Sequence, residues 1–157
     1  GLPGLAAQVF FVSPITSIRD IIADKDVGKA PLLPYSAMCA NGSLWMSYGI
    51  LLGNPAIWAP NVPALVCGAL YTGIFLRHCP ADANWLPKTP SWHLAGIAAA
   101  WGTCAGLGLM LPADQAANIL GTIGVGVCVV MFAGPLAAIK TVLKDKSTKT
   151  LSFPLTV

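Results

Sequence analysis

Asn41, Trp45 and Asn61 stand inside apolar stretches of this 157-residue chain, where unpaired polar groups are costly. The side-chain amides of Asn41 and Asn61 both donate and accept hydrogen bonds, which suits a ligand rich in hydroxyl groups. Trp45 follows Asn41 by four residues, so the two share one face of a helix, and its flat indole suits the C–H face of a sugar ring. These residues predict a neutral site that holds its ligand weakly. Weak binding suits a protein that passes a solute on, because a tightly held solute would not leave.

Enzyme chemistry is not indicated by the sequence. It shows no nucleophile–base pairing, metal-ligand spacing or phosphate-binding loop, and we expect no catalytic residue, metal or cofactor. The glycines of residues 121–126, GTIGVG, are better explained by helix packing. The chain has no Glu and its six Asp lie in connections, which argues against ion coupling through buried carboxylates. The five cysteines are scattered and odd in number, so we interpret them as small packing residues.

The composition is that of an integral membrane protein. Hydrophobic residues make up 55% of the chain and charged residues only 10%, far below the roughly 25% of soluble domains. Windows near the ~20 residues that a membrane-spanning helix needs suggest five spans and the start of a sixth. The windows are residues 1–18, 31–53, 57–76, 93–111 and 118–139, and the sixth begins near 150. We therefore predict an all-α, multi-pass fold, with close helix packing at Gly102 and Gly106.

The basic residues follow a strict alternation along the chain. All nine Lys and Arg fall in the first, third and fifth connections, at residues 19–30, 77–92 and 140–149. Basic residues in short loops mark the cytoplasmic side, so this pattern predicts the N-terminus on the non-cytoplasmic side. It also gives the net charge of +3 a meaning other than nucleic-acid binding. His78 and His93 flank the third connection, and we expect both to be solvated.

An internal repeat relates residues 11–29 to residues 132–150. The identical pairs are Phe11 with Phe132, Pro14 with Pro135, Ile18 with Ile139, Asp24 with Asp145 and Lys25 with Lys146. An even number of crossings separates the first and fifth spans, so both copies run in the same direction. Parallel repeats are typical of transporters that hold the substrate at the repeat interface.

This repeat predicts two parallel three-helix units joined by a linker helix. We assign residues 1–79 to the first unit and residues 80–117 to an inner loop, the linker helix and an outer loop. Residues 118–157 would begin the second unit with its first helix and the start of the next.

Four stretches resemble the SWEET sugar transporters of the PQ-loop group. They are SPITSIRDIIADKD, LPYSAMCANGSLWMSYGILLGN, NVPALVCGALYTGIFL and AGPLAAIKTVLKDKSTKTLSFPLTV. The resemblance covers nearly the whole chain and is weakest over residues 80–117. It implies a seven-helix architecture and bidirectional uniport of mono- or disaccharides by alternating access, in the plasma membrane or an organelle membrane.

The resemblance also implies roles for single residues. Asn61 matches the sugar-binding asparagine of the third helix, Trp45 matches a position that contacts the sugar ring, and Asn41 faces the same pocket. Tyr48 resembles an outer-gate residue. The family's hinge prolines are matched by Pro14, Pro34 and Pro135, and by Pro154 with a displacement of two residues.

Two alternatives stay open beside the sugar uniporter. The chain holds one three-helix unit but little of the second, so it is alternatively an accessory subunit of a larger membrane assembly without transport activity. It is also compatible with a PQ-loop relative that carries another small solute. The expected partners are a sugar, membrane lipid, and either further copies of the chain or a larger assembly, but no nucleic acid.

Overall fold

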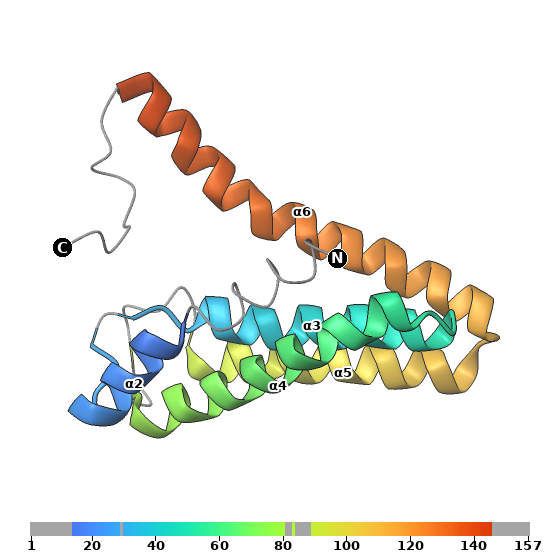
Figure 1. Ribbon diagram of the computed structural model, residues 1–157, viewed down its shortest axis with the longest axis horizontal. Helices are drawn as coiled ribbons and strands as arrows, with labels where there is room; N and C mark the ends of the chain where they lie inside the picture. Colours follow the sequence, from blue (N-terminus) through green and yellow to red (C-terminus); the bar gives the residue numbers. More distant parts are fainter. Residues whose placement is uncertain (1–13, 29, 81–82, 84–88, 146–157) are drawn as a thin grey trace.

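The computed structural model describes residues 14–28, 30–80, 83 and 89–145, with the backbone alone from residue 130 onward. The described residues form helices and connections without a β-strand. The helices are α2 (Ile15–Asp24), α3 (Leu33–Leu51), α4 (Pro55–His78), α5 (Pro90–Met110) and α6 (Ala113–Asp145). Helix α3 lies between the others and contacts α4, α5 and α6 (Figure 1).

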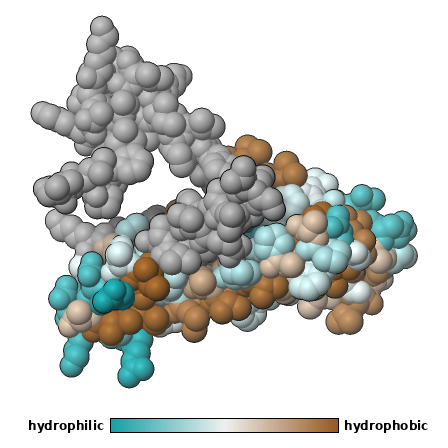
Figure 2. Space-filling view, in the orientation of Figure 1, coloured by the Kyte–Doolittle hydropathy of each residue, from teal (hydrophilic) through white to brown (hydrophobic). Residues whose placement is uncertain are grey.

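Two of the described helices, α4 with 24 residues and α5 with 21, are long and apolar enough to cross a bilayer. At 1.5 Å per residue α4 is about 36 Å long, against about 30 Å for the hydrocarbon core. Figure 2 shows apolar residues along the length of the bundle and hydrophilic residues gathered at both ends. That distribution is what a protein surrounded by lipid requires.

Helices α2 and α6 extend beyond the predicted ends of their spans. The first and fifth connections were expected to begin at residues 19 and 140, yet the chain stays helical to Asp24 and to Asp145. In α2, Ile18 and Ile21 are 3% and 4% exposed and anchor this extra turn against the bundle. Figure 1 shows α2 and α4 ending at the same end of the bundle, and α6 running toward that end while its last turns diverge from the bundle. The charge alternation places the basic residues at this end.

Residues Leu52 to Pro55 determine the turn between α3 and α4. Gly53 adopts a left-handed conformation with φ 60°, which glycine tolerates without strain. The Asn54 side chain accepts a hydrogen bond from the Ala56 backbone N–H at 3.0 Å, and Pro55 occupies the first turn. Glycine, cap and proline together allow two long helices to run antiparallel with almost no loop.

Glycines bring α3 and α4 into backbone contact. A Cβ atom on Gly42 would lie 2.8 Å from the Leu65 backbone nitrogen, and one on Gly68 would collide with the backbone of Cys39. By contrast, a Cβ on Gly102 or Gly106 would meet no described atom within 4 Å. The close packing predicted at that pair is therefore not seen in the described residues, because these glycines lie on a face of α5 turned away from α3.

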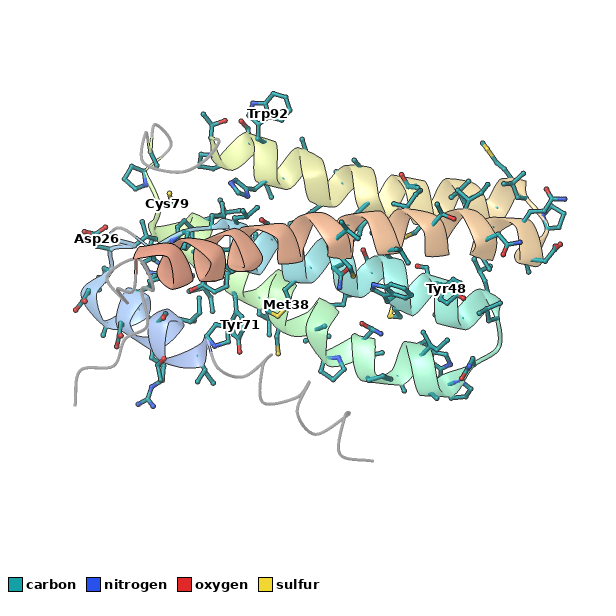
Figure 3. The ribbon with its side chains drawn as sticks, turned by 90° about the horizontal axis from the view of Figure 1, so that it is seen from above. Asp26, Met38, Tyr48, Tyr71, Cys79 and Trp92 are labelled. Carbon is teal, nitrogen blue, oxygen red and sulfur yellow. The ribbon has the colours of Figure 1, made fainter. Side chains whose placement is uncertain are left out.

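An aromatic core joins α2, α3 and α4 near the end of the bundle that carries α2. The Tyr35 ring lies 6.0 Å from the rings of both Tyr71 and Phe75, and Phe75 is fully buried. Figure 3 shows Asp26 and Cys79 at this same end, on the connections after α2 and α4. Burial, and then the Asp26 carboxylate, raise the pKa of the Cys79 thiol. All five cysteines are free thiols.

Candidate functional site

Trp45 and Tyr48 line a cavity of ≈ 390 Å³ between α3 and the first part of α6. Their ring centroids are 5.5 Å apart and the rings are perpendicular, at 89°. Figure 3 shows Tyr48 on α3, close to α6. The cavity is completed by residues of α6, namely Ala117, Asn118, Gly121, Thr122 and Val125. None of these lining side chains is charged, as the sequence predicted for a neutral site.

Two glycines of α6 make room for the aromatic rings. A Cβ atom on Gly124 would lie 3.2 Å from Cζ2 of Trp45, and one on Gly121 would lie 3.0 Å from Cε2 of Tyr48. Both distances are tighter than ordinary van der Waals contact, so the rings rest on bare backbone. The GTIGVG stretch thus serves packing, and it packs against two of the predicted site residues.

Asn41 continues the same face of α3, one turn from Trp45. Its side chain is half-buried, and its Oδ1 accepts a hydrogen bond from the Cys128 thiol of α6 at 3.6 Å. Asn41, Trp45 and Tyr48 therefore all face α6, the helix that begins the predicted second repeat. The spacing of four residues predicted this alignment for Asn41 and Trp45.

Asn61 lies elsewhere, on α4, and does not line this cavity. Its side chain is half-buried and donates a hydrogen bond through Nδ2 to the Ile57 carbonyl at 2.8 Å. Pro60 and Pro63 flank it, yet α4 remains an α-helix through both prolines. The structure therefore brings three of the four predicted site residues together, and leaves Asn61 bonded to its own helix. Its contact with a sugar stays a prediction.

The hinge prolines take different positions in the helices. Pro14 immediately precedes α2, and Pro34 stands in the first turn of α3, where a missing N–H breaks no helical bond. Pro34 therefore does not interrupt a helix, contrary to the expectation for a span beginning at residue 31. Pro135 lies inside α6, and Pro154 lies outside the described residues.

Asn118 and Thr122 are site residues that the sequence analysis missed. Both line the cavity from α6, and the Thr122 hydroxyl donates a hydrogen bond to the Asn118 carbonyl at 2.8 Å. Two polar residues spaced by four in an apolar window were a usable signal. Like Asn41 and Trp45, these two residues share one face of a helix, and as polar groups they are costly in an apolar environment.

His93 was expected to be solvated, but the structure shows that it is buried. It is only 8% exposed, and its Nδ1 lies 2.8 Å from the Ser36 hydroxyl of α3. Helix α5 begins at Pro90, so His93 falls in the first turn of a packed helix rather than in a loop. A buried partner on α3 replaces the water that the sequence analysis expected.

Replacing Ser36 with alanine should lower the free energy of unfolding by about 1–3 kcal/mol, because it leaves a buried ring nitrogen unpaired. Ser91→Ala is the matched control, since Ser91 is exposed and lies in the same turn of α5 as His93. This substitution should change the free energy of unfolding by less than about 0.5 kcal/mol. Thermal unfolding of both variants in detergent measures the difference. If Ser36→Ala and Ser91→Ala unfold at the same temperature, the Ser36–His93 contact contributes nothing to stability.

Comparison with known proteins gives this arrangement a family. The family model described as "Sugar efflux transporter for intercellular exchange" matches residues 5–83 and 118–157. The chain belongs to this family, the SWEET transporters. Sugar transporter SWEET1 of Xenopus laevis is 29% identical over 147 residues, which cover 94% of this chain and 67% of that protein. Sugar transporter SWEET1 of Homo sapiens is 27% identical over 151 residues, covering 94% and 65%. Bidirectional sugar transporter SWEET16 of rice is 27% identical over 147 residues, covering 92% and 44%.

A solved eukaryotic SWEET transporter shares the fold. It superposes with a TM-score of 0.74 at 19% sequence identity, covering 94% of this chain and 70% of the other. The predicted all-α membrane architecture of the SWEET type is thereby confirmed. The chain spans about two thirds of the length of the SWEET1 relatives.

Proposed function

We propose that this SWEET chain carries sugars through the membrane by facilitated diffusion in both directions. The observation that supports this function best is the cavity at Trp45 and Tyr48. It is uncharged, it is lined by two aromatic rings of α3 and two polar residues of α6, and it lies between these two helices, which we assign to the first and second repeats. A site placed between two repeats can open to either side as the repeats rock against each other.

Each site residue has a proposed role. The Trp45 indole stacks on the sugar ring, while the amides of Asn41 and Asn61 bond its hydroxyl groups. For Asn61 this requires the amide to exchange its bond with the Ile57 carbonyl for one with the sugar. Tyr48, stacked edge-on against Trp45, closes the pocket toward the end of α3.

The proposed mechanism is uniport by alternating access, with the units 1–79 and 118–157 moving about the linker of residues 80–117. Pro14, Pro34, Pro135 and Pro154 are the proposed hinges. Pro34 would bend the chain at the junction before α3 rather than inside that helix. The N-terminus lies on the non-cytoplasmic side, because the basic connections mark the opposite side as cytoplasmic.

Uptake of radiolabelled glucose and sucrose into liposomes that contain the full-length protein tests this function. Wild type should transport at least one of these sugars, and Asn61→Ala should lower its uptake roughly fivefold to tenfold through loss of one or two hydrogen bonds. Asn54→Ser is the matched control, because serine preserves the cap of the same helix. Undiminished uptake by Asn61→Ala would refute the site assignment. If no sugar moves at all, the accessory-subunit alternative gains most.

A further inference from the structure

Helices α3 and α6 face each other in an antiparallel register that three contacts define. The contacts are Asn41 with Cys128, Trp45 with Gly124, and Tyr48 with Gly121. Each step along α3 is matched by an equal step back along α6, so one further turn places Asn118 beside Leu51, the last residue of α3. Asn118 therefore lies beyond Tyr48, toward the end of the bundle where Figure 1 shows the α3–α4 and α5–α6 turns. The charge alternation assigns this end to the non-cytoplasmic side.

The side-chain amide of Asn118 is accessible from the cavity. Asn118 is exposed and lines the cavity together with Tyr48 and Thr122. The Thr122 hydroxyl bonds the main-chain carbonyl of Asn118, and no described residue bonds the side-chain amide. The donor and the acceptor of this amide are both open to a molecule in the cavity, and a hydroxyl group can pair with either.

The helix that carries Asn118 is firmly packed at this point. Ala116, Ala117 and Leu120 are 0%, 1% and 0% exposed, which fixes this turn of α6 in place. An amide on an ordered helix binds a ligand at little cost in conformational entropy. Because none of the residues that line the cavity is charged, the ligand that fits best is neutral and rich in hydroxyl groups.

Asn118 lies too far from Asn41 to share one sugar ring with it. Cys128, which bonds Asn41, follows Asn118 by ten residues, or about 15 Å along the helix axis. The ring of Tyr48 rests on Gly121, between these two levels. A sugar bonded to Asn118 is therefore on the other side of Tyr48 from the site at Trp45 and Asn41.

We propose that Asn118 forms an entry subsite, where a neutral sugar binds outside Tyr48 before it reaches Trp45. The inference rests on the proposed sugar transport, to which it adds a first binding step. The Asn118 amide donates to and accepts from the sugar hydroxyls while the Tyr48 ring still closes the inner site. A sugar that enters from this end contacts Asn118, then Tyr48, then Trp45.

Sugar protection of a thiol at position 118 tests the subsite without relying on transport. The full-length Asn118→Cys variant in liposomes is treated with sulfonatoethyl methanethiosulfonate, a thiol reagent that does not cross membranes, and mass spectrometry identifies the modified residue. Glucose or sucrose should slow modification at position 118 roughly threefold or more, because a bound sugar covers the thiol. Gln115→Cys is the matched control, since Gln115 is exposed in the first turn of α6 but does not line the cavity. Its modification should not depend on sugar.

Uptake measurements show what the subsite contributes to transport. Asn118→Leu removes the amide at similar volume and should raise the apparent KM for sugar entry roughly threefold to tenfold without lowering the maximal rate. Asn118→Gln keeps an amide and should lie closer to wild type. Gln115→Leu should transport like wild type.

The outcomes separate this proposal from the proposed function. If wild type transports sugar but sugar gives no protection at position 118, the entry subsite is wrong and the transport function stands. If sugar protects position 118 but wild type transports none, the subsite stands and the transport function is wrong. Absence of any modification of Asn118→Cys would show that the position is covered, which overturns the subsite. Loss of protection when Trp45→Ala is added to Asn118→Cys would place Asn118 in the inner site and refute a separate one.

Discussion

Gly68→Ala should destabilise the protein by about 3 kcal/mol, because the added methyl group meets rigid backbone. The new Cβ would collide with the backbone nitrogen of Cys39 on α3. It would also lie only 2.7 Å from the Cα atom of Cys39. A flexible side chain could rotate away from such a contact, but the backbone of a packed helix cannot. Relief requires α3 and α4 to move apart over several turns, which loosens the contacts at Gly42 and Gly49 as well.

The matched control for this prediction is Gly73→Ala in the same helix. Nothing lies within 4 Å of a Cβ at Gly73, so alanine should be neutral or should stabilise α4 by up to about 1 kcal/mol. Thermal unfolding of the two variants in the same detergent compares them directly. If both variants unfold at the wild-type temperature, the close approach of α3 and α4 is not as described.

The contrast between these glycines shows where sequence reasoning about the fold stops. Apolar windows located α3, α4 and α5 within a few residues, because the need to cross about 30 Å of hydrocarbon is a property of each helix alone. Which glycines pack is a property of helix pairs. Gly102 and Gly106 have the spacing expected of a packing motif but face open space, while Gly42 and Gly68 have no such motif and meet backbone. The partner helix, which the sequence does not name, makes this difference.

In the candidate site too, the sequence predicted what a single helix fixes and missed what depends on a partner helix. Asn41 and Trp45 were predicted to share a face because helical spacing fixes it, and both face α6 together with Tyr48. That Gly121 and Gly124 would be their neighbours depends on how α6 docks, and no local pattern states this. His93 was placed in solvent for a similar reason. Its position near a charged connection was visible in the sequence, but its partner Ser36, 57 residues away, was not.

Trp45→Ala should reduce sugar transport roughly thirtyfold at low sugar concentration. Loss of a tryptophan from the centre of a binding site typically costs about 2 kcal/mol or more, which corresponds to that factor. In the proposed function the indole is the apolar surface on which the sugar ring rests, so its removal weakens binding and should raise the apparent KM. Trp45→Phe, which keeps a smaller ring, should lie between wild type and alanine.

Trp92→Ala is the control, because Trp92 lies near the start of α5, is 64% exposed, and does not line the cavity. It should transport at close to the wild-type rate. The concentration dependence of uptake distinguishes the reasons for a loss in Trp45→Ala. A raised KM with a preserved maximal rate identifies lost sugar binding, as expected. A lowered maximal rate with unchanged KM would instead mean that Trp45, seated against Gly124, governs how α3 and α6 move past each other. In that case the ring would belong to the moving interface between the repeats and not to the sugar site.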